Sequence, residues 1–400
     1  MTDRLYYTDS YARQFTARVV EQIVLDERPA VVLDRTLFYP ASGGQPSDRG
    51  TLGGADVMDV ISRESDRAVL HVLSQPLRET EVRGEVDWAR RFDHMQQHTG
   101  QHILSQAFLR TAEAETVSFH LGADSVTIDI ATERVTPALA EKTEEIANGV
   151  VIGDAPVRAW FPSADETAKL SLRKTPDVDG ALRVVAIGDF DLTACGGTHV
   201  ARTGEVGLIK ILKVEKQKKN TRVEFRCGWR ALGDYNHKNT LVNQLAADFT
   251  CGIAEVDQAV AKLRAEANTL RKELKSAREE LIGHEAAEMI ASAPAQRGWK
   301  VVRKAWAERD ANEVRGLAAR LAATPGTVAL LGTGGAKAHV VLARAPDVDR
   351  DMNAIFKSAL VVLDGARGGG DARLAQGGGV AADLGAVERV LDEAERELFK

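Results

Sequence analysis

Two short patterns, far apart in this 400-residue chain, carry the side chains best suited to chemistry. The first is His98-Thr-Gly-Gln-His102 and the second is Cys195-Gly-Gly-Thr-His199. A spacing of four residues puts both rings of the first pair on one face of a helix. The two glycines of the second predict a tight loop whose backbone approaches something closely. Three imidazoles and one thiolate are a complete set of zinc ligands, so the two patterns together predict a metal site.

Each pattern alone has a simpler explanation. Two histidines one turn apart occur on many helices as packing or surface residues, and a lone cysteine is more often a small buried apolar residue. The histidine pair also differs from the His-Glu-x-x-His pattern of metallopeptidases, because positions 99–101 are Thr, Gly and Gln and supply no glutamate base. Only the combination of the two patterns indicates a metal.

The composition favours a soluble protein of the cytoplasm. The chain is 44% hydrophobic and 28% charged, as in soluble globular proteins, and its length predicts two or three domains. No apolar run approaches the roughly 18 residues of a membrane span, and Met1–Leu5 lacks the apolar core of a secretion signal. Three cysteines cannot form a disulfide framework. We therefore expect a cytoplasmic protein without a membrane partner. At a net charge of −6, any nucleic acid must be bound by local basic patches.

The first 230 residues predict an α+β unit. Turn-separated strands fill the first 90 residues, and a helix over Trp88–Arg110 carries His98 and His102. A second helix runs from Pro137 to Gly149, with Thr136 as its cap. The expected strands are Val19–Val24, Val31–Leu33, Ala68–Leu73, Glu81–Val86, Val126–Ile130, Val157–Phe161, Leu182–Ile187, Val206–Val214 and Val223–Cys227.

The remaining sequence predicts a long helix and a separate small α/β domain. From Leu241 to Ile290 the pattern is helical, and apolar residues alternate in steps of four and three. Such a seam packs on another helix, within its own domain, in a hairpin or in a second copy. These seam residues are Val256, Val260, Leu263, Ala267, Leu270, Leu274, Ala277 and Leu281. The small domain has strands at Lys300–Arg303, Val328–Leu331 and His339–Leu342, helices at Val314–Leu321 and Ala386–Leu398, and a glycine-rich loop over residues 365–379.

With these motifs, the chain resembles the free-standing alanyl-tRNA editing proteins of the AlaX type in their long form. It is similar to the editing and C-terminal parts of alanyl-tRNA synthetase. The resemblance rests on Phe38–Gly50, His98–His102, Cys195–Gly207 and Arg222–Phe225, with the Arg367–Gly379 glycine cluster resembling the tail domain.

The resemblance implies a fold in four parts. These are a glycine-rich β-barrel-like domain at 1–90, an α+β editing core with a metal-bearing helix at 91–235, a coiled-coil-like helical linker at 236–295, and a C-terminal α/β domain for tRNA binding or dimerisation at 296–400. A homodimer would form through the helix at 250–285 or through the last domain.

It also implies a trans-editing hydrolase that serves translation fidelity. The enzyme, an aminoacyl-tRNA deacylase, would cleave the aminoacyl ester of tRNA(Ala) mischarged with serine, and Gly-tRNA(Ala) is a further candidate substrate. One zinc ion per chain would be held by His98, His102, Cys195 and His199. No side chain is assigned as catalytic, since a zinc-bound water could serve. Four protein ligands usually close a zinc site, so it stays open whether all four bind at once, with His199 as the candidate for the loosest ligand.

Further residues are candidates for binding. Gly43, Gly44 and Gln45 would line the amino-acid pocket, with Gln45 selecting serine through its hydroxyl or, alternatively, only stabilising a turn. Arg222 would contact substrate phosphate. Candidate tRNA contacts are Lys216, Lys218 and Lys219 in the connection between the last two strands of the core, and Arg367 and Arg373 in the tail. His94, one turn before His98, is either a supporting residue or, as we expect, a surface residue.

Two other functions remain open. One is a non-catalytic tRNA-binding protein with a structural zinc. The other is a metal-dependent phosphoesterase, disfavoured because an Asp-His-His pattern is absent from the sequence. A complete synthetase is not expected, because the editing motifs begin within 50 residues of Met1; ATP is therefore not expected as a substrate.

Overall fold

The N-terminal part of the chain is a closed β-barrel in this computed structural model, which describes residues 2–123, 125–173 and 182–400. Its strands are β2 (Gln14–Leu25), β3 (Arg28–Leu33), β5 (Gly50–Leu52), β6 (Ala55–Ser62), β7 (Val69–Leu73) and β8 (Glu81–Val86). The short strand β1 (Asp3–Arg4) pairs with β4 (Arg35–Thr36), and the 3-10 turn η1 (Leu5–Tyr7) directly follows β1. The barrel order is β2-β3-β7-β6-β5-β8. Alternate residues of β8 are buried, and Phe15, Leu33 and Val60 help to fill the interior. The predicted barrel is confirmed, although β5 and β6 were not foreseen.

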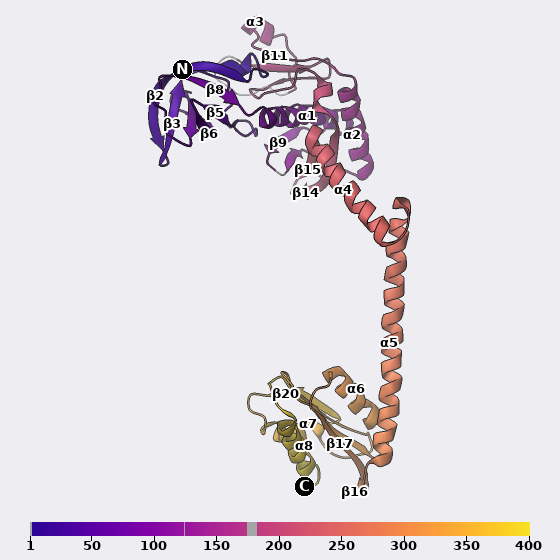
Figure 1. Ribbon diagram of the computed structural model, residues 1–400. Coiled ribbons are helices and arrows are strands. Elements are labelled where there is room, and N and C mark those ends of the chain that lie inside the picture. The colour runs from indigo at the N-terminus through magenta and orange to yellow at the C-terminus, as the bar shows by residue number, and fades with distance from the viewer. Residues whose placement is uncertain (1, 124, 174–181) are drawn as a thin grey trace. The chain divides into compact units, whose positions relative to one another are not determined.

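Helix α1 (Trp88–Ala112) follows the last barrel strand (Figure 1). Asp87 caps its start by accepting a hydrogen bond from the Arg90 backbone N–H, and Glu113 ends it in the left-handed conformation with φ 52°. The middle of the helix is buried on nearly every side, including its polar residues. The predicted helix is therefore present and fixed in place by its surroundings.

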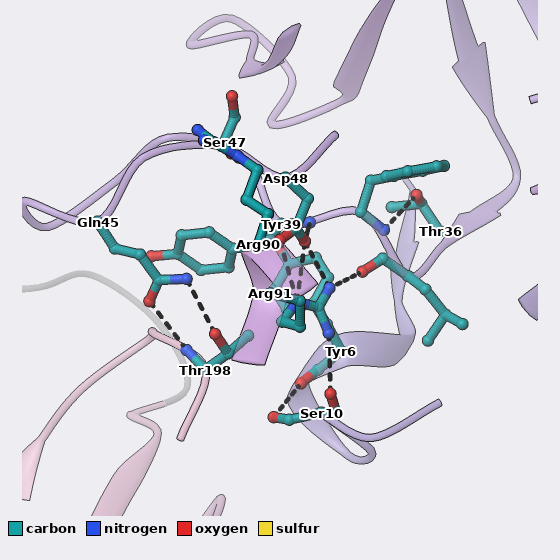
Figure 2. A network of polar contacts seen from close by, with 12 residues as sticks. Tyr6, Ser10, Thr36, Tyr39, Gln45, Ser47, Asp48, Arg90, Arg91 and Thr198 are labelled. Carbon is teal, nitrogen blue, oxygen red and sulfur yellow. Dashed lines mark hydrogen bonds and ion pairs between the residues drawn. The ribbon is translucent and has the colours of Figure 1, made fainter. Parts of the chain in front are cut away.

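A buried ion pair ties α1 to the barrel (Figure 2). Arg91 and Asp48 are both fully buried, and Arg91 Nε lies 3.0 Å from Asp48 Oδ1. The remaining guanidinium hydrogens are donated to the carbonyl oxygens of Ser10 and Leu37, and Asp48 also accepts from the Tyr39 backbone N–H at 2.6 Å. Because all three guanidinium nitrogens donate to Asp48 or to backbone carbonyls, the pair fixes the Leu37–Asp48 loop against the helix.

The rest of the first unit surrounds α1 with two sheets. The first has the order β14-β15-β10-β9 and the second β11-β12-β13, each antiparallel throughout. Met95, Ile103, Val126 and Phe225 belong to the core between helix and sheet. The elements are β9 (Thr116–Leu121), β10 (Val126–Ile130), α2 (Pro137–Ile152), β11 (Val157–Trp160), α3 (Ala164–Thr167), β12 (Val184–Ile187), β13 (Asp191–Ala194), η2 (Thr203–Val206), β14 (Ile209–Gln217), β15 (Asn220–Cys227) and α4 (Gly228–Asp248).

The chain divides into two units, Met1–Leu245 and Ala246–Lys400. The second contains a six-stranded sheet of order β16-β17-β18-β19-β21-β20, over an apolar core that includes Leu330, Val340 and Phe356. Its elements are η3 (Ile253–Glu255), α5 (Val256–Ser292), β16 (Ala295–Gln296), β17 (Trp299–Trp306), α6 (Ala311–Ala322), β18 (Thr327–Thr333), β19 (His339–Arg344), α7 (Met352–Leu360), β20 (Arg367–Gly370), β21 (Leu374–Gly378) and α8 (Leu384–Leu398). The mixed α and β content agrees with the predicted class, while the division into four domains stays a prediction.

Two local expectations were wrong. The helix expected over Leu241–Ile290 is interrupted between α4 and α5, where Thr250 has a φ of 51°. The glycine-rich segment is a hairpin of β20 and β21 rather than a loop, and α7 was missed. The seam residues Leu263, Leu270, Leu274 and Leu281 are exposed on α5, so a coiled-coil partner or homodimer stays a prediction. Among the described residues, no helix is both long and apolar enough to cross a membrane.

Candidate metal centre and its cavity

The two sequence motifs meet inside the first unit. His98 and His102 come from the middle of α1, and Cys195 and His199 from the loop after β13. Gly197 is required for this meeting, because a Cβ there would lie 2.2 Å from His98 Cε1. The glycine-permitted close approach inferred from the sequence is therefore present at Gly197.

The four side chains form one group that could hold a metal ion. Their ligand atoms all lie within 4.8 Å of one another. Cys195 Sγ is 3.4 Å from His98 Nε2 and 3.4 Å from His199 Nε2. The three imidazoles are at most 5% exposed, and Cys195 is half-buried. The arrangement is thus a largely buried cluster of one sulfur and three imidazoles.

Each imidazole also has an oxygen beside its outer nitrogen. His98 Nδ1 lies 2.7 Å from Gln45 Oε1, and His199 Nδ1 lies 3.1 Å from Thr99 Oγ1. His102 Nδ1 lies 3.4 Å from Asp191 Oδ2, at the long limit of a hydrogen bond. Oxygen partners of this kind fix a ring's orientation and tautomer, as they do around bound metals.

The charges of the cluster suit a cation. Burial opposes ionisation of Cys195, yet the three histidines around it hold the pKa of its thiol well below the ordinary value. Burial also opposes protonation of His102, but Cys195 and Asp191 raise its pKa to about 9. Burial lowers the pKa of His199 to about 3, so that ring is neutral. A thiolate and a protonated imidazole therefore face each other, and a metal cation can replace that proton.

Arg183 holds the loop that bears Cys195 through hydrogen bonds to its backbone. The sequence analysis did not predict this residue. Its Nη1 donates to the carbonyl oxygens of Cys195 at 3.0 Å and Gly197 at 2.8 Å, and its Nε donates to Tyr7 O at 3.3 Å. The residue is only 6% exposed, and among the described residues no carboxylate pairs with it. The positive charge thus lies beside the Cys195 thiolate and holds the loop that bears it.

A cavity of about 300 Å³ is lined by three of the four candidate ligands, His98, His102 and Cys195, while His199 is not among its lining residues. It is lined by the barrel loop, by β9 and by the segment leading to the cysteine loop. The lining residues include Tyr39, Ser42, Gly43, Gln101, Thr116, Phe119, Arg173, Thr193 and Gly196. This volume is at the small end of ligand pockets and can enclose a small aminoacyl group.

Of the three residues predicted to line the amino-acid pocket, Gly43, Gly44 and Gln45, only Gly43 is among the residues that line the cavity. Gly44 packs so tightly that a Cβ would lie 2.5 Å from Phe119 O. Gln45 is 1% exposed, and its Oε1 lies 2.7 Å from His98 Nδ1. Its Nε2 donates to Thr198 Oγ1 at 2.9 Å, and its Oε1 also accepts from the Thr198 N–H (Figure 2). Both ends of the Gln45 amide are therefore occupied.

The predicted tRNA-binding side chains lie outside this cavity. Arg222 forms two hydrogen bonds with Asp129 on the neighbouring strand, at 2.7 and 2.8 Å. Lys218 and Lys219 form the turn between β14 and β15, and Lys216 lies 3.6 Å from Glu133. Arg367 and Arg373 are exposed in the second unit. The surface assignment of His94 was wrong, since it is 2% exposed and packed near Arg90, Arg91 and Arg230.

The supporting residues carried weak sequence signals. Thr99 lies within the first motif, and Asp191 lies four residues before Cys195 on a strand whose alternate residues are buried. Those spacings could have identified both of them. Nothing local marks Arg183, because its partners are carbonyl oxygens of a loop that follows twelve residues later.

Comparison with known proteins adds independent information. Residues 182–224 match the family described as the threonyl and alanyl tRNA synthetase second additional domain. The chain is 39% identical over 247 residues to "Alanyl-tRNA editing protein AlaX-L" of Pyrococcus horikoshii, covering 59% of this chain and 60% of that protein. It is 36% identical over 282 residues to "Alanyl-tRNA editing protein Aarsd1" of Bos taurus, covering 66% of this chain and 63% of that protein.

A longer match is 32% identical over 410 residues to "Alanine--tRNA ligase" of Halorubrum lacusprofundi, covering 98% of this chain and 43% of the ligase. A solved structure of the C-Ala domain from Aquifex aeolicus alanyl-tRNA synthetase matches 26% of this chain and 97% of that domain, at 25% identity and a TM-score of 0.23. The matches thus span less than two thirds of the length of these three curated relatives. They confirm the resemblance to AlaX-type alanyl-tRNA editing proteins.

Proposed function

We propose that the chain is a trans-editing hydrolase, on the basis of its sequence similarity to alanyl-tRNA editing proteins. It cleaves the ester that joins serine to tRNA(Ala), with Gly-tRNA(Ala) as a second candidate substrate. The observation that carries this proposal is the convergence of four metal-ligating side chains beside a cavity of about 300 Å³. Such a cavity fits a small amino acid, and a metal next to it lies close to the ester.

Zinc is the metal that suits the donor set. One thiolate and three imidazoles are borderline and soft ligands, which hard cations such as Mg²⁺ and Ca²⁺ do not prefer. Two ligands at roughly 2.0–2.3 Å from a tetrahedral zinc lie about 3.5 Å apart, and the two measured distances from Cys195 Sγ are 3.4 Å. When bound, zinc supplies Lewis acidity toward the ester carbonyl.

The protein's own groups hold this donor set in position. Gln45 Oε1 accepts the Nδ1 proton of His98, and the Asp191 carboxylate faces that of His102. The hydrogen bond keeps His98 in the tautomer whose Nε2 is free to bind a metal, and the Asp191 carboxylate, 3.4 Å from His102 Nδ1, favours the same tautomer of His102. The contacts of Gln45 favour this positioning role over the direct selection of serine, because its Oε1 is already used by His98 and the Thr198 N–H and its Nε2 donates to Thr198. Gln45 is also buried and is not among the residues that line the cavity.

Basic side chains on two surfaces are the candidate tRNA contacts. Lys218 and Lys219 form an exposed hairpin turn, and Arg367 and Arg373 are exposed on the second unit. Among the described residues, no carboxylate forms an ion pair with any of these four, so they are available to phosphates. Arg222 is a weaker candidate, since it is already paired with Asp129.

A non-catalytic tRNA-binding protein is the second candidate. The observation that favours it is the same cluster, because four protein ligands close a tetrahedral zinc shell and are typical of structural sites. Under this alternative, zinc stabilises the first unit and no ester is cleaved.

Deacylation by a cysteine variant separates the two candidates. The full-length protein is expected to deacylate Ser-tRNA(Ala), and Cys195→Ala to lower that rate at least about a hundredfold together with metal affinity. Cys251→Ala is the matched control, since Cys251 lies outside the ligand group. A zinc-loaded wild type without activity would reject the hydrolase in favour of the alternative. An active Cys195→Ala protein would show that hydrolysis does not depend on the metal-ligand group.

A further inference from the structure

Most polar groups in the cavity wall already have partners within the protein. The Tyr39 hydroxyl donates to Ser42 O at 3.2 Å, and Thr116 Oγ1 donates to Ser105 Oγ at 2.6 Å. Ser118 Oγ donates to Asp129 Oδ2 at 2.7 Å. These groups shape the cavity but have little left with which to recognise a polar substrate.

Thr193 is an exception. It lies on β13 between Asp191, which faces His102, and Cys195, and side chains two residues apart share one face of a strand. The residue is 5% exposed and lines the cavity. Within residues 2–123, 125–173 and 182–400, nothing hydrogen-bonds to its hydroxyl. A hydroxyl in a cavity wall that has no partner in the protein can bind a group that enters the cavity.

Gln101 supplies a second free polar atom in the same wall. It immediately precedes the ligand His102 on α1 and is 6% exposed. Its Nε2 donates to Ser105 Oγ at 2.8 Å, and Ser105 is held in turn by Thr116. This chain of contacts fixes the amide, whose Oε1 has no partner in the described part of the chain. The cavity therefore contains one fixed acceptor and one hydroxyl that can donate or accept.

We infer that Thr193 Oγ1 and Gln101 Oε1 form the subsite for the side-chain hydroxyl of the amino acid to be removed. The inference rests on the proposed editing function and specifies how serine is chosen. A serine hydroxyl would donate to Gln101 Oε1 and accept from Thr193 Oγ1. Alanine would leave both atoms without a partner, and a site built around a substrate hydroxyl rejects an analogue that lacks it. Glycine lacks the hydroxyl too, so this subsite disfavours Gly-tRNA(Ala) relative to Ser-tRNA(Ala).

The role of Thr193 in binding the serine hydroxyl can be tested by a binding measurement that does not depend on hydrolysis. The probes are 3′-amino-3′-deoxyadenosine carrying serine or alanine through a stable amide, titrated into the zinc-loaded full-length protein. We expect the seryl amide to bind roughly ten- to a hundredfold more tightly than the alanyl amide, and Thr193→Val to remove this preference. Thr193→Ser keeps the hydroxyl and should retain the preference. Thr333→Val, at a buried threonine of the second unit, is the matched control.

The outcomes for the subsite and for the hydrolase are distinct. A serine preference that survives Thr193→Val, the absence of any preference, or no binding of either amide by the zinc-loaded protein would overturn the subsite. Zinc content measured on each variant shows whether the cluster remains intact. Hydrolysis of Ser-tRNA(Ala) is assayed separately, so a hydroxyl preference lost in Thr193→Val without turnover would support the subsite and reject the hydrolase.

Discussion

The interiors of the two units differ in kind. The first unit buries histidines, arginines and carboxylates, among them Arg91, Asp48, His71 and the metal-ligand group. Within the described part of the second unit, Thr327 and Thr333 are the only buried polar residues, and the rest of its interior is apolar.

This difference indicates where chemistry is located. Burying a polar or charged group costs free energy unless the group is paired. A cluster of such groups therefore indicates a function beyond the packing of the core. In the first unit Gln45, Asp191 and Arg183 contact the cluster or its loop, while Arg91, Asp48 and His71 are paired within the barrel and where it meets α1. The second unit has an interior suited to stability alone, and any role in substrate binding lies on its surface.

The sharpest way to break this comparison is to uncouple the buried ion pair. Asp48→Asn leaves Arg91 buried without a counter-charge, and we expect a loss of about 3–5 kcal/mol in the unfolding free energy of the first unit. Hydrogen–deuterium exchange resolved by peptide should show faster exchange across the barrel and α1, with the second unit unchanged. Thr333→Val is the control in the second unit. Equal protection of the barrel in wild type and Asp48→Asn would contradict a structural role for the pair.

The second largest expected effect is a loss of stability of the first unit at acidic pH, caused by its buried histidine His71. Burial lowers the pKa of His71 to about 4, below the ordinary value of about 6.5. Between these values the unfolded state binds the extra proton, so the contribution of neutral His71 is complete above pH 6.5 and is lost as the pH falls toward 4. From pH 7 to pH 5 this amounts to about 2 kcal/mol. Urea unfolding of the wild type and of His71→Gln should show a smaller pH dependence in the variant; identical pH profiles would argue against a neutral buried His71.

Arg183 tests whether the polar interior supports the metal. Arg183→Met removes the two hydrogen bonds to the carbonyls of the cysteine loop. We expect metal affinity to fall roughly ten- to a hundredfold, as for other residues that orient metal ligands. Competition with a chromophoric chelator gives the affinity, and the absorption of the cobalt-loaded protein reports the cysteine–metal bond. Arg303→Met in the second unit should change neither quantity, and unaltered affinity in Arg183→Met would remove the positioning role.

The smallest expected effect concerns the surface of the second unit. Replacing Arg367 and Arg373 together by alanine should weaken tRNA binding a few-fold. If each contacts one phosphate, the double variant lowers the slope of log affinity against log salt by about 2. Arg315→Ala, at an exposed residue of α6 in the same unit, is the control. Identical salt slopes in the double variant and the wild type would place the tRNA contacts elsewhere.

Hydrophobic periodicity and motif spacing in the sequence were sufficient to predict several helices and strands and the meeting of the two motifs. The helix at Trp88–Arg110 and the strand at Val126–Ile130 were correctly predicted, and the two motifs do meet. Partners remote in sequence could not be foreseen. Gln45 contacts Thr198 across 153 positions, and Arg183 binds carbonyl oxygens that carry no side-chain pattern.

Glycine misled the prediction in the second unit. The sequence predicts a loop after Gly365, yet β20 and β21 pair there so closely that a Cβ at Gly368 would lie 2.4 Å from Gln376 O. Here glycine permits a close strand contact rather than flexibility.

The most direct test of the account compares two substrates on one sample. Initial deacylation rates of Ser-tRNA(Ala) and Ala-tRNA(Ala) are measured with the full-length protein, alongside its metal content, before chelation, after chelation and after zinc is returned. The account predicts about one zinc per chain, hydrolysis of the seryl ester with the alanyl ester spared, and loss and recovery of activity with the metal. Equal hydrolysis of both esters, or an undiminished rate in metal-free protein, would contradict it.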